Sequence, residues 1–102
     1  MFRKSIEELV KDEQDKLVID LREREEYEKE TYPGAIHIYH KDFYKYLSVL
    51  PRNKRIYLIC YTGVTGAEIA EELSLRGYDI YSIDEGYQAV VRMNVQKLMK
   101  KN

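Results

Sequence analysis

Cys60 is the residue whose type and position most clearly predict chemistry, and it is the chain's one cysteine. It follows an apolar run at 56–59, and a short segment with two glycines separates it from a stretch with helical periodicity. In open α/β sheets, ligands bind where loops leave the carboxyl ends of strands and enter helices. Unpaired N–H groups and the positive end of a helix dipole at such a place stabilise a thiolate, the nucleophilic form of cysteine. We therefore predict that Cys60 is a nucleophile.

The loop after Cys60 is what favours a function over a buried structural thiol, the more usual fate of a cysteine that ends an apolar strand. Gly63 and Gly66 allow successive backbone amides to turn inward around one point and form an anion cradle. Such a cradle holds an oxyanion or a negatively charged sulfur attached to Cys60. The residues that we predict to bind substrate form this loop: Tyr61, Thr62, Gly63, Val64, Thr65 and Gly66.

Two other kinds of site fit the sequence less well. The loop is not a nucleotide-binding P-loop, because it lacks the lysine and the glycine spacing of that motif. The two histidines, His37 and His40, lie near a turn far from Cys60 in the sequence. Surface or hydrogen-bonded positions are more usual for such histidines than metal ligation. We expect no metal site and no cofactor.

The elements that must position the loop alternate along the chain. Short apolar runs predict strands at 17–20, 35–38, 55–60 and 79–83. Helical spacing predicts helices at 5–11, 23–29, 42–50, 66–76 and 87–100, the first opened by a capping box of Ser5 and Glu8. This alternation predicts an α/β fold, with a parallel sheet and helices on both of its faces.

Length and composition limit the classes of protein that remain. The chain has 102 residues, a formal net charge of −1 and 44% hydrophobic residues. We expect one domain over 1–102, since no linker or repeat divides the sequence. Balanced charge argues against a general nucleic-acid binder, and the apolar runs are too short to span a membrane. A single cysteine suits a reducing compartment, so we expect a cytoplasmic protein.

Four segments in order resemble the rhodanese family. Residues 18–23, 26–27 and 32–36 are similar to its first signature, V-D-V-R-E…E-Y…I-P-G-A-I. Residues 60–66 match the active loop C-x-x-G-x-x and the start of its helix, whereas 76–78 and 84–87 resemble the later R-G-(F/Y)…L-x-G-G segment. This resemblance covers nearly the whole chain. It implies a five-stranded, mainly parallel sheet flanked by helices on both faces, with the cysteine at the bottom of the loop.

The resemblance also implies an activity. Cys60 would take sulfane sulfur from thiosulfate or a persulfide donor, and pass it from a Cys60 persulfide to cyanide, a thiol or an acceptor protein. Two successive displacements imply ping-pong kinetics. Arg22 is a possible accessory residue near the edge of the site, and a structural ion pair with a nearby acid is an equal alternative.

The chain departs from the family pattern at several positions. Thr65 stands where an arginine often ends the loop, and Glu30-Thr31 replaces the usual Gly-His. One glycine of the G-G pair is missing, and Val90 stands in place of the usual tryptophan. These departures keep open the alternative of a non-catalytic rhodanese-like module that binds a partner or senses redox state. A phosphatase or arsenate reductase of the related fold would need a longer loop ending in arginine, and we discount it.

Overall fold

The computed structural model describes residues 2–100. Its strands are β1 (Arg3–Lys4), β2 (Lys16–Asp20), β3 (Ile36–His37), β4 (Arg55–Ile59) and β5 (Ile80–Ile83). Its helices are α1 (Ile6–Lys11), α2 (Arg24–Lys29), the 3₁₀ helix η1 (His40–Val49), α3 (Val64–Leu75) and α4 (Tyr87–Lys100). None of the helices within 2–100 is long and apolar enough to cross a membrane.

The five strands form one sheet in the order β1-β5-β4-β2-β3, and every neighbouring pair is parallel. The α/β fold and the five-stranded sheet are therefore confirmed. The most apolar run of the sequence, β4, lies at the centre, paired with β2 on one side and β5 on the other. A strand in this place is buried on both faces, which explains its continuous apolar pattern.

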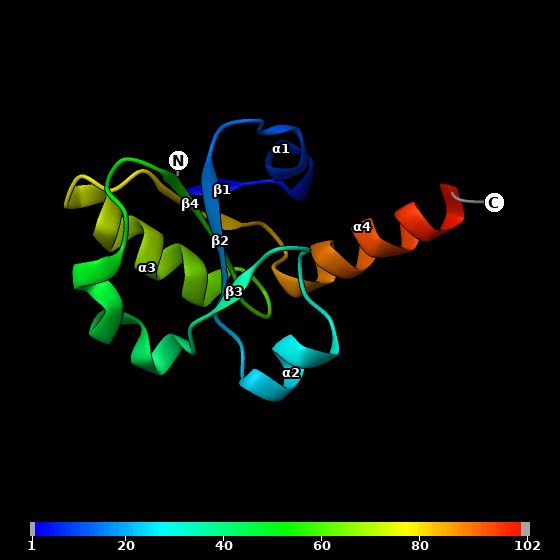
Figure 1. The fold of residues 1–102 in the computed structure, drawn as a ribbon, viewed down its shortest axis with the longest axis horizontal. Helices are drawn as coiled ribbons and strands as arrows, with labels where there is room; N and C mark the ends of the chain where they lie inside the picture. Colours follow the sequence, from blue (N-terminus) through cyan, green and yellow to red (C-terminus); the bar gives the residue numbers. More distant parts are fainter. Residues whose placement is uncertain (1, 101–102) are drawn as a thin grey trace.

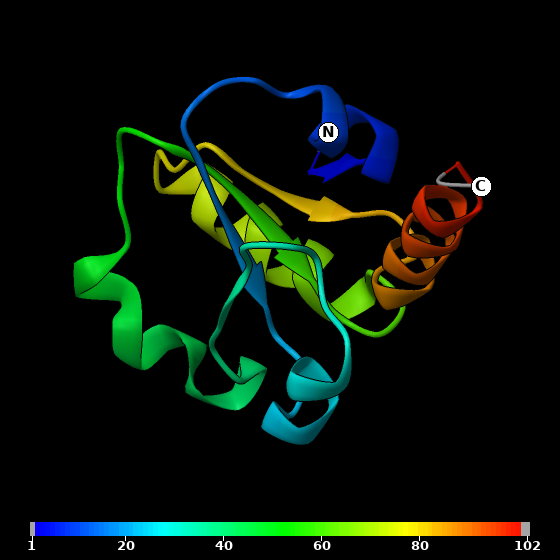
Figure 2. The ribbon, with the colours of Figure 1, turned by 45° about the vertical axis from the view of Figure 1, so that its right-hand side comes forward.

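Helices cover both faces of the sheet (Figures 1 and 2). On one face, α3 and η1 pack through Ile69, Leu73 and Phe43 onto the strands. On the other face, α1 and α4 bury Leu9 and Met93. Alternate residues of β2, β4 and β5 supply the two cores, and Cys60 belongs to the α3 side. Helix α2 buries no residue and lies at the carboxyl end of β2.

Two predicted helices differ in the structure, and one strand is additional. The segment predicted as a helix at 42–50 is the 3₁₀ helix η1, whose many aromatic residues have weak α-helical propensity. Helix α3 begins two residues earlier than predicted, because Gly63 is its N-cap. Strand β1 was not predicted, since two charged residues at a sheet edge show no apolar pattern. The capping box at the start of α1 is confirmed, with Ser5 and Glu8 bonded reciprocally.

A buried hydroxyl fixes β4 to the end of α1. Tyr57 is 1% exposed, and its hydroxyl donates a hydrogen bond to the carboxylate of Asp12, the C-cap residue of α1. Burial and the Asp12 carboxylate raise the pKa of Tyr57 to about 12. The same hydrogen bond, helped by the Gln14 N–H, holds the pKa of Asp12 below its usual value. The pair therefore stabilises the strand that leads into Cys60.

Tyr57→Phe should lower the free energy of unfolding by about 1–3 kcal/mol at pH 7, since a hydrogen bond to a charged group is lost. In the wild type, the Asp12 contribution is present above roughly pH 4 and is lost as pH falls through its lowered folded pKa. The Tyr57 contribution is complete below roughly pH 10 and is lost as pH rises towards about 12. Urea unfolding at pH 3, 7 and 11 measures both, and the variant should show a flatter pH profile.

The matched control is Tyr44→Phe, which removes a hydroxyl bonded to Glu72 at the surface. Because Tyr44 is 43% exposed, this change should alter stability much less. Equal losses in the two variants, or parallel pH profiles for wild type and Tyr57→Phe, would contradict the anchoring role.

Candidate active site

Cys60 lies directly after β4, where the chain turns into α3, and its side chain is buried, with 5% of the residue exposed. The Sγ atom accepts two backbone hydrogen bonds, from the N–H of Gly63 at 3.1 Å and from the N–H of Gly66 at 3.3 Å. Both donors belong to the N-terminal end of α3, where N–H groups have no partner within the helix. This geometry stabilises negative charge on the Cys60 sulfur or on an atom bound to it.

The loop closes around Cys60 because two positions carry no side chain. A Cβ at Gly66 would come within 2.5 Å of the Ser82 hydroxyl oxygen on β5. A Cβ at Gly86, at the start of α4, would overlap the carbonyl oxygen of Cys60. That carbonyl instead accepts the N–H of Tyr87 at 2.7 Å. The loop is therefore held between β5 and the first turn of α4.

Ser82 was missed by the sequence analysis, although a signal for it exists. It is a polar residue within the otherwise apolar strand β5, and it is completely buried. Its hydroxyl donates to the carbonyl oxygen of Gly63 at 3.1 Å. Gly63 has a φ of 94°, a left-handed conformation that orients its own N–H towards Sγ. Ser82 thus supports the backbone turn that forms one of the two contacts to the sulfur.

The side chains of the other predicted loop residues are exposed or half-buried. Tyr61 is 46% exposed, and its hydroxyl donates to Glu23 at 3.1 Å, a contact that raises the pKa of Tyr61 together with partial burial. Thr62 and Val64 are exposed, and Thr65 is half-buried. Within residues 2–100, no hydrogen bond joins these side chains to Sγ. The contacts to the sulfur therefore come from the backbone.

Arg22 lies behind the loop and is completely buried. Its Nη2 atom lies 2.8 Å from Asp20 Oδ2, and a second hydrogen bond runs from Nε to the same carboxylate. Burial opposes the charge of the guanidinium, but the hydrogen bonds and charge of Asp20 outweigh it and raise the pKa of Arg22. Thr31 donates to the same carboxylate at 2.7 Å. The ion pair named above as one alternative for Arg22 is therefore present.

Arg22 also holds together parts of the chain that surround the loop. Its Nη2 donates to the backbone carbonyls of Glu26, within α2, and of Glu30, the C-cap residue of that helix. The guanidinium carbon lies 3.9 Å from the ring centroid of Tyr87 and 5.9 Å from that of Tyr61. Arg22 Nη1 is buried without a hydrogen-bond partner among the described residues. The two aromatic faces replace that partner with cation–π contacts.

Neither histidine is hydrogen-bonded to the Cys60 sulfur within residues 2–100. His37 Nε2 is 2.6 Å from the carbonyl oxygen of Arg22, and because a carbonyl only accepts, Nε2 carries the hydrogen. The His40 ring packs edge-on against Tyr39. In the part of the chain that the structure describes, no three His, Cys, Asp or Glu side chains form a group that would hold a metal ion.

Comparison with known proteins agrees with this geometry. The model of the rhodanese-like domain family matches residues 3–93. A tRNA sulfurtransferase of Desulfurococcus amylolyticus is 40% identical over 72 residues, which cover 71% of this chain but 14% of that protein. A thiosulfate sulfurtransferase GlpE of Coxiella burnetii is 28% identical over 82 residues, covering 79% of this chain and 76% of the relative.

Among solved structures, a rhodanese-like domain protein from Staphylococcus aureus is similar, with a TM-score of 0.76 and 25% identity. The alignment covers 87% of this chain and 90% of that one. The parallel sheet, the strand-to-helix loop that follows its central strand and the match over 3–93 lead to one conclusion. This chain belongs to the rhodanese-like domain family.

Proposed function

We propose that the chain is a single-domain sulfurtransferase that moves sulfane sulfur from thiosulfate or a persulfide donor to a thiophilic acceptor, with Cys60 as the carrier. The observation that carries this proposal is the pair of N–H groups, from Gly63 and Gly66, that converge on Cys60 Sγ. The relatives that match are named as sulfurtransferases, which supports the same class of reaction. The free thiol of Cys60 suits a reducing compartment, in agreement with a cytoplasmic protein.

The proposed reaction has two displacements at sulfur. The Cys60 thiolate attacks the outer sulfur of thiosulfate, the S–S bond of the donor breaks, and sulfite leaves with the bonding electrons. An acceptor such as cyanide or a thiolate then attacks the outer sulfur of the Cys60 persulfide, and the Cys60 thiolate is released. Each step forms one bond to sulfur and breaks one, so no external oxidant or reductant is needed. The kinetics are ping-pong.

The loop backbone supports both displacements. A persulfide carries negative charge on its outer sulfur, next to the Sγ atom at which the N–H groups of Gly63 and Gly66 point. These dipoles are already oriented before the reaction, so they stabilise the charge without a reorganisation cost. In this proposal, substrate is bound mainly by the backbone amides of the loop and less by its side chains. The loop residues are Tyr61, Thr62, Gly63, Val64, Thr65 and Gly66.

Arg22 acts in this proposal as a positioning residue. Its charge is largely balanced by Asp20 at 2.8 Å, so it adds little net field at the sulfur. Its contacts to the rings of Tyr61 and Tyr87 and to the C-terminal part of α2 instead hold the wall beside the loop. This reading combines the accessory role and the ion pair that the sequence left as alternatives.

The non-catalytic alternative draws on Thr65, since this chain lacks the loop arginine found in many relatives. A first test is intact-mass spectrometry after incubation with thiosulfate. We expect wild-type protein to gain one sulfur atom, to lose it on addition of cyanide, and Cys60→Ser to gain none. The variant should keep its fold, because serine fills nearly the same volume. An adduct on Cys60→Ser, or none on the wild type with thiosulfate or a persulfide donor, would leave the partner-binding module as the better reading.

Thr65→Arg tests whether thiosulfate is the donor. Thr65 lies in the first turn of α3, and an arginine there adds a charge-assisted contact to a dianion. We expect the KM for thiosulfate to fall by about tenfold, the equivalent of one such contact. Steady-state assays with cyanide as acceptor measure this, and Thr65→Gln controls for side-chain length. An unchanged or higher KM would contradict thiosulfate as a donor bound at this end of the loop.

Ser82→Ala tests the support of the Gly63 turn. Loss of the hydroxyl frees the Gly63 carbonyl, and we expect the rate constant for persulfide formation to fall by about tenfold, while stability falls by about 1 kcal/mol. The matched control is Ser74→Ala, whose hydroxyl also donates to a backbone carbonyl, that of Ile80, but away from the loop. Equal rates in the two variants would mean that Ser82 has only a structural role.

A further inference from the structure

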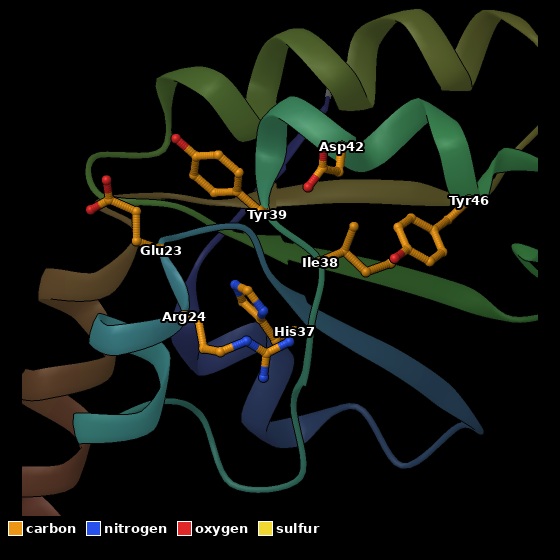
Figure 3. A pocket seen from close by; sticks show the side chains of 7 residues that line it. All are labelled: Glu23, Arg24, His37, Ile38, Tyr39, Asp42 and Tyr46. Carbon is orange, nitrogen blue, oxygen red and sulfur yellow. The ribbon is translucent and has the colours of Figure 1, made fainter.

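A hollow of about 400 Å³ lies beside the Cys60 loop, between the start of α2, the end of β3 and η1 (Figure 3). Its volume is in the range of small-molecule sites. The hollow and the loop are joined by one contact, because Glu23 lines the hollow and accepts the hydroxyl of Tyr61, the residue after Cys60. A molecule bound in the hollow would thus lie next to the sulfur-carrying loop.

Opposite charges line opposite sides of this hollow. In Figure 3, Glu23 and Asp42 lie along one side with the ring of Tyr39 between them, and the guanidinium of Arg24 and the ring of His37 lie along the other. The ring of His37 is fixed by its Nε2–H, which donates to a backbone carbonyl. A ligand that matches this arrangement carries both a cation and an anion.

The charged groups of the hollow are free to exchange partners. Asp42 is paired with Lys45 at 3.2 Å and Arg24 with Glu28 at 3.9 Å, and both pairs are exposed. Exposed pairs of this kind contribute between nothing and about 1 kcal/mol, so a ligand displaces them at little cost. The Tyr39 and Tyr46 rings complete the lining and offer faces on which an ammonium group is stabilised.

We propose that this hollow binds the α-amino acid group of a small zwitterionic thiol, and that this thiol is the acceptor of the sulfur carried by Cys60. The ammonium would lie on the side lined by Glu23, Tyr39 and Asp42, and the carboxylate against Arg24 and His37. The role as acceptor rests on the proposed sulfurtransferase function, whereas the binding site itself rests on the hollow alone.

The transfer step follows from this placement. The thiolate of the bound acceptor attacks the outer sulfur of the Cys60 persulfide, a new S–S bond forms on the acceptor, and the electrons of the broken bond remain on Cys60 as a thiolate. Glu23 exchanges the Tyr61 hydroxyl for the ammonium of the acceptor. Because Tyr61 is 46% exposed, its hydroxyl then bonds to water in place of Glu23.

Binding is tested without any sulfur transfer, in Cys60→Ser titrated with S-methyl-L-cysteine and followed by NMR. We expect amide shifts concentrated at the residues of the hollow, and affinities lowered by about fivefold to tenfold in Arg24→Gln and in Asp42→Asn. Two controls have similar surface ion pairs away from the hollow: Arg76→Gln, whose partner is Glu72, and Asp15→Asn, whose partner is Lys54. Shifts elsewhere, no shifts, or equal effects of the control variants would overturn the site.

The acceptor role is tested on persulfidated wild type, discharged by four thiols that differ in charge. L-Cysteine carries both charges, cysteamine the ammonium, 3-mercaptopropionate the carboxylate and 2-mercaptoethanol neither. Comparing each variant with wild type for the same thiol removes differences in thiol reactivity. We expect Arg24→Gln to slow the two carboxylate-bearing thiols most, and Asp42→Asn to slow the two ammonium-bearing thiols most, by about fivefold or more.

The two tests separate the two ways in which the proposal fails. If the hollow binds S-methyl-L-cysteine but no persulfide forms on Cys60, the sulfurtransferase function and the acceptor role are wrong and the site stands. If the persulfide forms but the two variants slow all four thiols equally, or none, the acceptor does not use this hollow and the sulfurtransferase function stands.

Discussion

The close approach of three backbone segments at Cys60 is the constraint on which the rest of the site depends. The loop after β4 passes so near to β5 and to the first turn of α4 that no side chain fits at Gly66 or Gly86. With those positions empty, the N–H of Gly66 reaches the sulfur, and the N–H of Tyr87 reaches the Cys60 carbonyl. The sulfur thus accepts hydrogen bonds from the N-terminal end of α3, and packing against β5 fixes the position of that end.

The wall of the site depends on the buried ion pair of Arg22 and Asp20. Removing two charges from water is costly, and the pair stabilises the fold only if its remaining donors find partners. Two carbonyls in the C-terminal part of α2 accept hydrogen bonds from the Nη2 group of Arg22, and the ring of Tyr87 faces the guanidinium. Helix α2 buries no residue completely, so these contacts fix its position together with Tyr27, which packs on the core and donates to the Ala35 carbonyl. The position of α2 in turn places Glu23 beside Tyr61, so the wall of the site follows from an ion pair behind it.

The sequence predicts best what depends on local pattern. The central strand, the loop that begins at Cys60, the capping box at Ser5 and the fourteen-residue helix α4 all follow from apolar spacing, glycine or capping residues within a short stretch. The features that it misses depend on distant contacts. Strand β1 exists because β5 offers it an edge, and Ser82 matters because Gly63 lies above it. The hollow between α2, β3 and η1 combines residues whose spacing in the chain shows no pattern.

The side chains around the loop contribute little net positive charge at the Cys60 sulfur. Thr65 adds no fixed cation, the charge of Arg22 is balanced by Asp20, and Glu23 lies beside the loop. The field at the sulfur therefore comes from backbone dipoles, which are short-ranged and equivalent to about half a charge at the helix end. Such a field suits a singly charged persulfide held in contact with the amides better than it attracts a dianion from solution. In the proposed reaction, capture and release of sulfur then depend on charged groups beside the loop, of which Glu23 is one.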